Sequence, residues 1–142
     1  MRCVDVNVLV YAHRSESPDH DAVRAWLEHA AAGPEPLGLP ELALSAYLRI
    51  VTNRRIFLEP TPTDVAVDSI ERMLAAPAVE TLRPGRRHLG LFLDLCRRTR
   101  AMGNDVPDAY YVALAIEHGC TFVTADPRIR RFPDVRIDQP FG

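Results

Sequence analysis

The sequence predicts an α/β fold built on a central, mostly parallel sheet, and three observations support this. Short apolar runs alternate with longer segments whose apolar residues recur at helical spacing, as in strands joined by helices. The length of 142 residues suits one domain with one core. No repeat, low-complexity stretch or linker divides the chain. We therefore expect residues 1–142 to form a single domain.

Turn residues set the boundaries of the expected elements in the first half of the chain. Ser17-Pro18-Asp19 begins a helix whose apolar residues recur every three or four positions, and Gly33 breaks it. Pro40 suits the first turn of the next helix, where a missing N–H needs no partner. The elements expected here are a strand at 2–4, helices at 7–13 and from 17–19 to 33, a strand at 37–39, and a helix from 40 to about 52.

Proline and glycine divide the second half in the same way. Thr61-Pro62-Thr63-Asp64 opens a helix that Pro77 ends, and Gly103 and Gly119 end two later helices. The buried stripe expected for the first of these helices is Val65, Val67, Ile70, Met73 and Leu74. The elements expected after it are a strand at 79–82, helices at about 86–100 and 105–118, a strand at 120–124 and an edge strand at 135–137.

Four acidic residues stand out by their position relative to these elements. Asp5 ends the first strand, and Asp126 follows the strand at 120–124 by one residue. Glu41 and Asp108 each open a helix. Each residue has an ordinary explanation as a cap, a first-turn acid or a turn residue. Ligands of open parallel sheets bind beyond the carboxyl ends of the strands, so we expect the four side chains to converge there.

Carboxylates that converge at one edge require protons or a cation. Two of them about 4 Å apart repel by on the order of 4 kcal/mol at an effective dielectric near 20. Oxygen-only ligands suit Mg²⁺ or Mn²⁺ rather than Zn²⁺. A hard divalent ion held in this way can activate water and neutralise a phosphate, as in many nucleases. The acids therefore indicate metal-assisted hydrolysis of a phosphodiester.

Polar neighbours extend the candidate site. Asn7 and Thr124 could hold metal-bound waters or orient Asp5 and Asp126, with a helix cap and a strand-end hydroxyl as the alternatives. Asp105 competes with Asp108 for a place in the site. We prefer Asp108 because it lies just inside the helix, whereas Asp105 is expected upstream in the loop.

The basic residues are all arginine, and the formal net charge is −2. This charge argues against a general polyanion binder. Arg128, Arg130 and Arg131 nevertheless follow Asp126 directly and are our candidates for phosphate contacts, which would make binding salt-dependent. A solvated helix face or ion pairs with the acids is the alternative. Composition alone does not separate RNA from DNA.

The cysteines and the hydropathy pattern bear on location. Cys3, Cys96 and Cys120 are odd in number and far apart, which supports neither a disulfide framework nor a zinc site. We expect thiols buried in a reducing cytosol. No apolar run reaches the roughly 18–20 residues that span a bilayer, and the N-terminus lacks a secretory signal. A cytoplasmic protein without a membrane partner is expected.

Several motifs resemble those of one known family. Val4-Asp5-Val6-Asn7-Val8-Leu9 resembles the N-terminal signature of PIN domains. Asp108-Ala109 with the segment 113–119 resembles their third-acid helix, and Thr121-Phe122-Val123-Thr124-Ala125-Asp126 resembles their final acidic strand end. Residues 48–57 are similar to one branch of actinobacterial VapC toxins. The matches follow in order over nearly the whole chain, which is thereby identified as a member of the VapC family of PIN-domain ribonucleases.

This resemblance implies a three-layer α/β/α fold and a Mg²⁺-dependent endoribonuclease, with Mn²⁺ as a substitute ion. It also implies the toxin of a VapBC-like toxin–antitoxin pair that cuts structured RNA, plausibly tRNA, leaves 5′-phosphate and 3′-hydroxyl ends, and inhibits translation and growth. A homodimer and a cognate VapB-like antitoxin that blocks the active site are implied as partners. By matching position, Asp5 and Asp108 are the principal metal ligands, Asp126 is a further acid that contacts the metal, and Glu41 is the catalytic acid on the third helix. The match of Glu41 is the loosest, because that helix varies in register.

One departure from the family pattern concerns the end of the site. Many relatives carry a second acid two residues after the one that matches Asp126, followed by Phe, where this chain has Arg128 and Ile129. The change implies a less acidic site, for which Asp105 is a candidate to compensate. A catalytically degenerate PIN scaffold that binds RNA or antitoxin without cleavage therefore stays open as an alternative.

Two other folds that gather aspartates at a parallel sheet are disfavoured. A receiver domain and a haloacid-dehalogenase-like phosphatase each use a lysine at the phosphoryl group, and this chain contains no lysine. The phosphatase also needs Asp-x-Asp, whereas the chain has Asp5-Val6-Asn7.

Overall fold

A computed structural model describes residues 1–141 and contains a five-stranded sheet in the order β3-β2-β1-β4-β5. Every neighbouring pair of strands is parallel. The strands are β1 (Arg2–Val4), β2 (Leu37–Pro40), β3 (Val79–Leu82), β4 (Thr121–Val123) and β5 (Arg136–Asp138). The helices are α1 (Val6–His13), α2 (His20–Ala32), α3 (Glu41–Val51), α4 (Thr63–Leu74), α5 (His88–Thr99), α6 (Asp105–Glu117) and the short 3₁₀ helix η1 (Pro127–Arg131).

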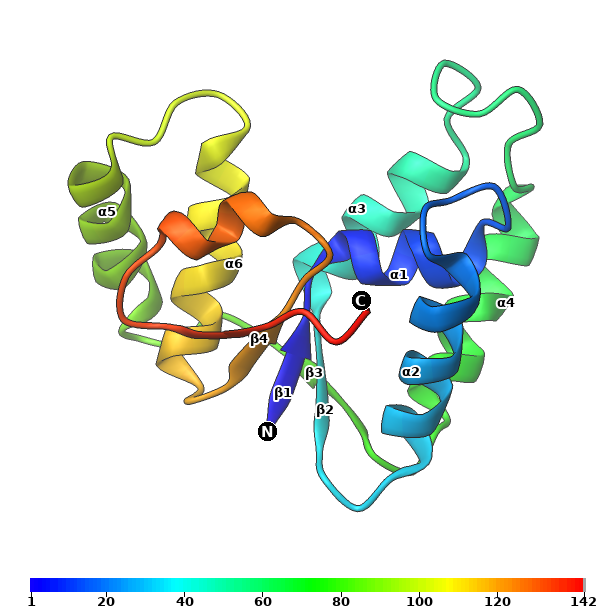
Figure 1. Ribbon diagram of the computed structural model, residues 1–142, viewed down its shortest axis with the longest axis horizontal. Coiled ribbons are helices and arrows are strands. Elements are labelled where there is room, and N and C mark those ends of the chain that lie inside the picture. The colour runs from blue at the N-terminus through cyan, green and yellow to red at the C-terminus, as the bar shows by residue number, and fades with distance from the viewer. Residues whose placement is uncertain (142) are drawn as a thin grey trace.

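Helices cover both faces of this sheet. Figure 1 shows α1 to α4 on one side and α5 with α6 on the other, so that the strands form the middle of three layers. Parallel strands that are covered on both faces are buried along their whole length. Cys3, Val4, Phe122 and Val123 in the two central strands are accordingly 0% exposed. The α/β/α arrangement that the sequence predicted is confirmed.

The predicted order of elements is also confirmed, and the boundaries shift by a few residues. The largest error concerns α4, where Val65 and Leu74 of the expected apolar stripe are exposed. Ala66 and Ser69 are buried instead, and the hydroxyl of Ser69 lies 2.8 Å from that of Tyr47 in α3. Ile70 and Met73 of the predicted stripe are partly buried and pack against the core, as expected.

The expectation of buried thiols is confirmed for two of the three cysteines. Cys3 and Cys120 are buried free thiols, and Cys96 is partly exposed. Among residues 1–141, no helix combines the length and the apolar character needed to cross a membrane.

Candidate active site

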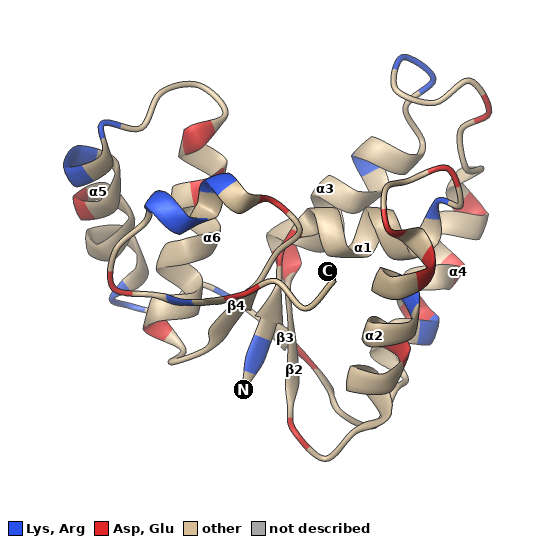
Figure 2. Cartoon of the chain, in the orientation of Figure 1, with Lys and Arg blue, Asp and Glu red and all other residues tan. Residues whose placement is uncertain are grey.

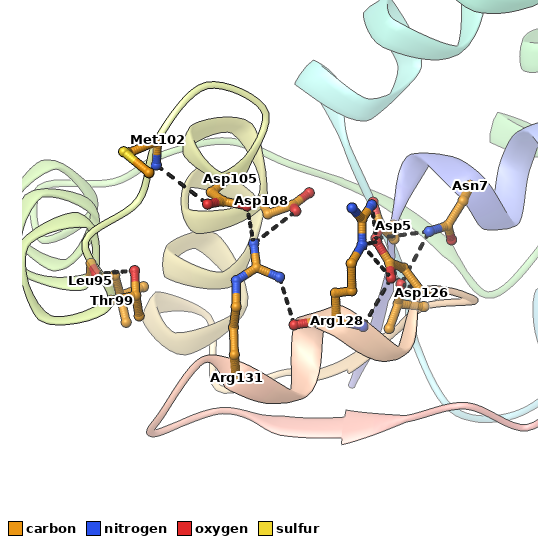
Figure 3. A network of polar contacts seen from close by, with 11 residues as sticks. Asp5, Asn7, Leu95, Thr99, Met102, Asp105, Asp108, Asp126, Arg128 and Arg131 are labelled. Atoms are coloured by element: carbon orange, nitrogen blue, oxygen red, sulfur yellow. Dashed lines mark hydrogen bonds and ion pairs between the residues drawn. The ribbon is translucent and has the colours of Figure 1, made fainter.

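The topology of the sheet brings Asp5, Asp108 and Asp126 to the edge at which the strands end, which we call the rim. In the register of β1 and β4, Val4 lies opposite Val123, and the N–H of Asp5 continues the ladder by donating to the carbonyl of Val123 at 2.8 Å. Helix α6 leads back into β4, so its first turn, with Asp108, lies at the carboxyl end of the strands. Asp126 follows β4 at the same end. Figure 3 shows these side chains around one region of the molecule.

Asp5 is the most deeply buried of these acids, with 3% of its surface exposed. Its side chain caps α1 by accepting from the N–H of Val6 at 2.7 Å, and it also accepts from the hydroxyl of Thr124 at 2.8 Å. The pKa of Asp5 is raised to about 6, chiefly by burial and in part by the charges of Asp108 and Asp126, while the hydrogen bonds from Thr124 and Val6 oppose the rise. The hydroxyl of Thr124, which donates to Asp5, also accepts from the backbone N–H of Asp126, so these two acids are neighbours.

Asn7 and Thr124 fix the orientation of Asp5. The amide of Asn7 donates to Asp5 and to the hydroxyl of Thr124, both at 3.2 Å. The side-chain oxygen of Asn7 accepts from the N–H of Ala125 at 3.0 Å, and the Thr124 hydroxyl accepts from the N–H of Asp126 at 3.0 Å. These bonds join the segments after β1 and β4 into one network, which is the orienting role expected of both residues.

The carboxylate of Asp126 is bound by the backbone and the side chain of Arg128 in the segment that follows it. Its carboxylate caps η1 by accepting from the N–H of Arg128 at 2.9 Å. The guanidinium of Arg128 also contacts both carboxylate oxygens, at 2.9 to 3.2 Å. Arg128 accordingly holds the pKa of Asp126 below its usual range. For Arg128 the structure thus shows the ion pair that the sequence left open as the alternative to a phosphate contact.

Asp105 and Asp108 share a second arginine. Nη2 of Arg131 lies 2.8 Å from Asp105 and 3.3 Å from Asp108, while its Nη1 donates to the carbonyl of Arg128 at 2.6 Å. Burial raises the pKa of Asp108, and the bond from Arg131 opposes that rise. The expectation that Asp105 lies in the loop is wrong, since α6 begins at Asp105 and places both acids in its first turn.

The donor chemistry at this rim fits a hard divalent ion, because the carboxylates of Asp5, Asp108 and Asp126 offer only oxygen ligands and repel one another. They do not form a preassembled cage. In the part of the chain that the structure describes, no three His, Cys, Asp or Glu side chains are arranged to hold a metal ion. Three of the four predicted acids follow strands or open a helix at this end of the sheet, and two of them are paired with arginines.

Two of the predicted site residues lie outside this group. Glu41 pairs with Arg83 at 2.7 Å, and no hydrogen bond or ion pair within residues 1–141 joins it to the other acids. Its position at the start of α3 agrees with the prediction. Its ion pair with Arg83 was not predicted. Arg130 donates to the side chain of Gln139 at 2.7 Å. Figure 2 shows the basic residues of η1, the short helix after β4, beside the acidic first turn of α6.

The sequence reasoning missed Tyr111. It lies three residues after Asp108, which places both on one face of α6. The residue is 4% exposed, and burial raises the pKa of its hydroxyl to about 12, helped by the negative charge of Asp5.

Comparison with known families and sequences gives a consistent result. A family model described as PIN domain matches residues 2–135. The chain is 46% identical to ribonuclease VapC43 of Mycobacterium tuberculosis over 140 residues, which cover 99% of this chain and 95% of that protein. It is 41% identical to ribonuclease VapC25 of the same species, with 99% of each chain covered.

Solved structures support the fold. The VapBC2 complex of Rickettsia felis, bound to a DNA fragment from its promoter, contains a chain that matches with a TM-score of 0.73 at 16% identity, with 96% of each chain covered. VapC20 of Mycobacterium tuberculosis, described as a toxin that cleaves the sarcin-ricin loop, matches with a TM-score of 0.63 at 18% identity. That match covers 96% of this chain and 99% of the other. At these identities the structures establish a common fold.

Proposed function

This chain belongs to the PIN-domain family and, within it, to the VapC ribonucleases, and we propose that it is a Mg²⁺-dependent endoribonuclease, the toxin of a toxin–antitoxin pair. The observation that supports the metal dependence is the rim itself. A buried Asp5, oriented by Thr124 and Asn7, lies within electrostatic range of Asp108 and Asp126. Arg128 and Arg131 offset part of the charge of this group, and a hard divalent cation would offset the rest.

The residues of the chain have separable tasks in this proposal. Asp5 and Asp108 would be the principal ligands of the ion, with Asp126 as a further acid beside them, and the bound ion would supply the activation of water and the neutralisation of phosphate charge. Thr124 and Asn7 restrict Asp5 to one orientation. No His or Lys lies among these contacts, so no side chain is an evident general base. Arg130, whose partner is the neutral Gln139, is available for an RNA phosphate.

The proposed partners are a cognate VapB-like antitoxin, a structured RNA substrate such as tRNA, and a second copy of the chain. Several structures with the same fold are VapBC complexes, which supports an antitoxin. The relatives named as ribonucleases support RNA as the substrate. An adjacent small reading frame that encodes a DNA-binding protein would be the natural candidate for the antitoxin.

Asp5→Asn and Asp108→Asn test the proposed chemistry. Each change removes one anionic ligand and keeps the side-chain shape, so we expect cleavage of RNA and growth inhibition to be lost while the fold is retained. Cleavage would be measured on total RNA with end mapping, in Mg²⁺, in Mn²⁺ and in EDTA. We expect 5′-phosphate and 3′-hydroxyl ends and no cleavage in EDTA.

Asp105→Asn is the matched control, because it changes the neighbouring acid in the same turn of α6 and is expected to reduce cleavage much less. Full toxicity of Asp5→Asn or Asp108→Asn would refute the proposal. A wild-type protein that binds RNA or antitoxin but cuts no RNA in either metal would establish the degenerate-scaffold alternative instead.

A further inference from the structure

The contacts of Arg128 differ from those of an ordinary surface arginine. Its side chain is 77% exposed, yet it bends back onto Asp126 of the acidic rim, whose carboxylate is only 20% exposed. Nε contacts both oxygens of Asp126, and Nη2 adds a contact to one of them. The same carboxylate caps the backbone N–H of Arg128, which fixes the start of the side chain. Both oxygens of Asp126 are thus occupied by a cation that the chain itself supplies.

Arg131 repeats this arrangement one turn of η1 later. Its guanidinium bridges Asp105 and Asp108 and is anchored to the backbone carbonyl of Arg128. Figure 3 shows the two arginines side by side between the first turn of α6 and the segment after β4. Asp5 is the rim acid that neither arginine contacts in the described residues. Its hydrogen-bond donors are the uncharged groups of Val6, Asn7 and Thr124.

The net charge of the side chains at the rim is balanced by one divalent ion. Four carboxylates and two guanidiniums carry a net charge of minus two, which one divalent ion neutralises. A second such ion would lie about 3.5–4 Å from the first and needs further carboxylate oxygens between them. Those of Asp126 are held by Arg128. The carboxylates are those of Asp5, Asp105, Asp108 and Asp126, and the guanidiniums are those of Arg128 and Arg131.

We propose that the guanidinium of Arg128, paired with Asp126, takes the place of a second metal ion, so that this chain binds a single divalent ion. The inference rests on the proposed function, because it assumes that Asp5 and Asp108 hold that ion. It makes Arg128 a positioning residue: the arginine supplies a fixed positive charge through Asp126 without occupying a ligand position of its own.

The test measures metal stoichiometry in the absence of RNA, so that it does not depend on cleavage. Protein stripped of metal is titrated with Mn²⁺ by calorimetry, and bound Mn²⁺ is observed by electron paramagnetic resonance.

The wild-type chain is expected to bind one Mn²⁺. Arg128→Asp is expected to bind two, with spectra that show coupling between neighbouring ions. Arg128→Gln, which frees Asp126 without adding an acid, is expected to tighten Mn²⁺ binding by up to about fivefold, the factor set by an exposed ion pair.

Arg130→Asp is the control. It makes the same change of charge two residues away in η1, where the arginine contacts Gln139, and it is expected to leave the stoichiometry at one. Two ions in the wild type, or one in Arg128→Asp, would overturn the inference and leave the proposed function standing. Two ions bound to Arg130→Asp would overturn it as well, because the change in net charge of η1 would then be enough to explain the second ion in Arg128→Asp. No bound ion in the wild type would overturn the proposed metal dependence together with it.

Discussion

At the scale of single residues, Asp5 shows how opposing forces set the chemistry of the site. Burial and two neighbouring carboxylates disfavour its charged form, while Thr124 and Val6 donate hydrogen bonds that favour it. Burial is the largest effect, and the pKa rises to about 6. The carboxylate is therefore ionised at neutral pH, but at a cost in stability that a bound cation would remove.

This raised pKa predicts a pH-dependent effect of Asp5→Asn. The folded protein binds the proton of Asp5 more tightly than the unfolded chain does, so this group lowers the free energy of unfolding as pH rises from about 4 to about 6. The total loss is on the order of 3 kcal/mol. In EDTA, Asp5→Asn should therefore gain stability relative to wild type across this pH range, and the difference should be constant above it.

Urea unfolding of both proteins between pH 4 and pH 8 measures this difference. A difference in unfolding free energy that does not change with pH would contradict the raised pKa. Addition of Mg²⁺ at pH 8 is expected to stabilise the wild type more than the variant, because only the wild type regains the energy of the buried charge.

Single residues also show where sequence reasoning succeeds. The positions of Asp5, Asn7 and Thr124 could be predicted because each lies within three residues of a strand end, and the ends of neighbouring parallel strands meet. The partners of Glu41 and Arg131 could not be predicted. Arg83 and Asp105 are 42 and 26 residues away in sequence, and only the packing of separate elements brings them into contact.

At the scale of elements, the connection from α6 through β4 to η1 builds half of the site. The first turn of α6 carries Asp105 and Asp108, and η1 carries the arginines that contact them. The sequence predicted the helix and the strand from apolar periodicity and glycine caps. It missed η1, because five residues containing three arginines have no apolar period to detect.

The close packing of β1, β2 and β3 leads to a prediction at Gly38. A Cβ added there would lie 2.5 Å from Cδ1 and 2.9 Å from Cγ of Leu82, and 3.3 Å from Cβ of Cys3. Gly38→Ala is therefore expected to lower the free energy of unfolding by about 1–3 kcal/mol, as overpacking of a core usually does. Chemical denaturation would measure the change.

Gly90→Ala is the matched control, since a Cβ at this position in α5 meets nothing within 4 Å. It should be neutral or stabilise the protein by up to about 1 kcal/mol through helix propensity. Equal stability of the Gly38→Ala variant and the wild type would show that Leu82 moves aside without cost.

At the scale of the whole molecule, the parallel sheet gathers residues from opposite ends of the chain. Asp5 and Asp126 are separated by most of the sequence, yet adjacent strands place them at one rim. The formal net charge of −2 does not reveal this local concentration of anions or the basic helix beside it. Under the proposed function, recognition of RNA would therefore depend on where the charges lie rather than on their sum.

The proposed homodimer gives a prediction at the same scale. The homodimer is implied by the resemblance to the VapC family, and a measurement of mass in solution tests it directly. Light scattering coupled to gel filtration is expected to give twice the 15.9 kDa of one chain in the absence of antitoxin. A mass of one chain at micromolar concentration would contradict the homodimer and leave the ribonuclease assignment unaffected.

The amino-acid sequence by itself determined the order of helices and strands, the acidic residues at the strand ends and the hard-metal chemistry that they suggest. These features depend on apolar periodicity, turn residues and donor type, all of which are local properties of a chain. Only the tertiary structure decided which charges pair, how deeply Asp5 is buried, and that Arg128 and Arg131 lie on the acids instead of in solvent. Ion pairing and desolvation depend on distances between elements, and those distances are set by packing rather than by spacing along the sequence.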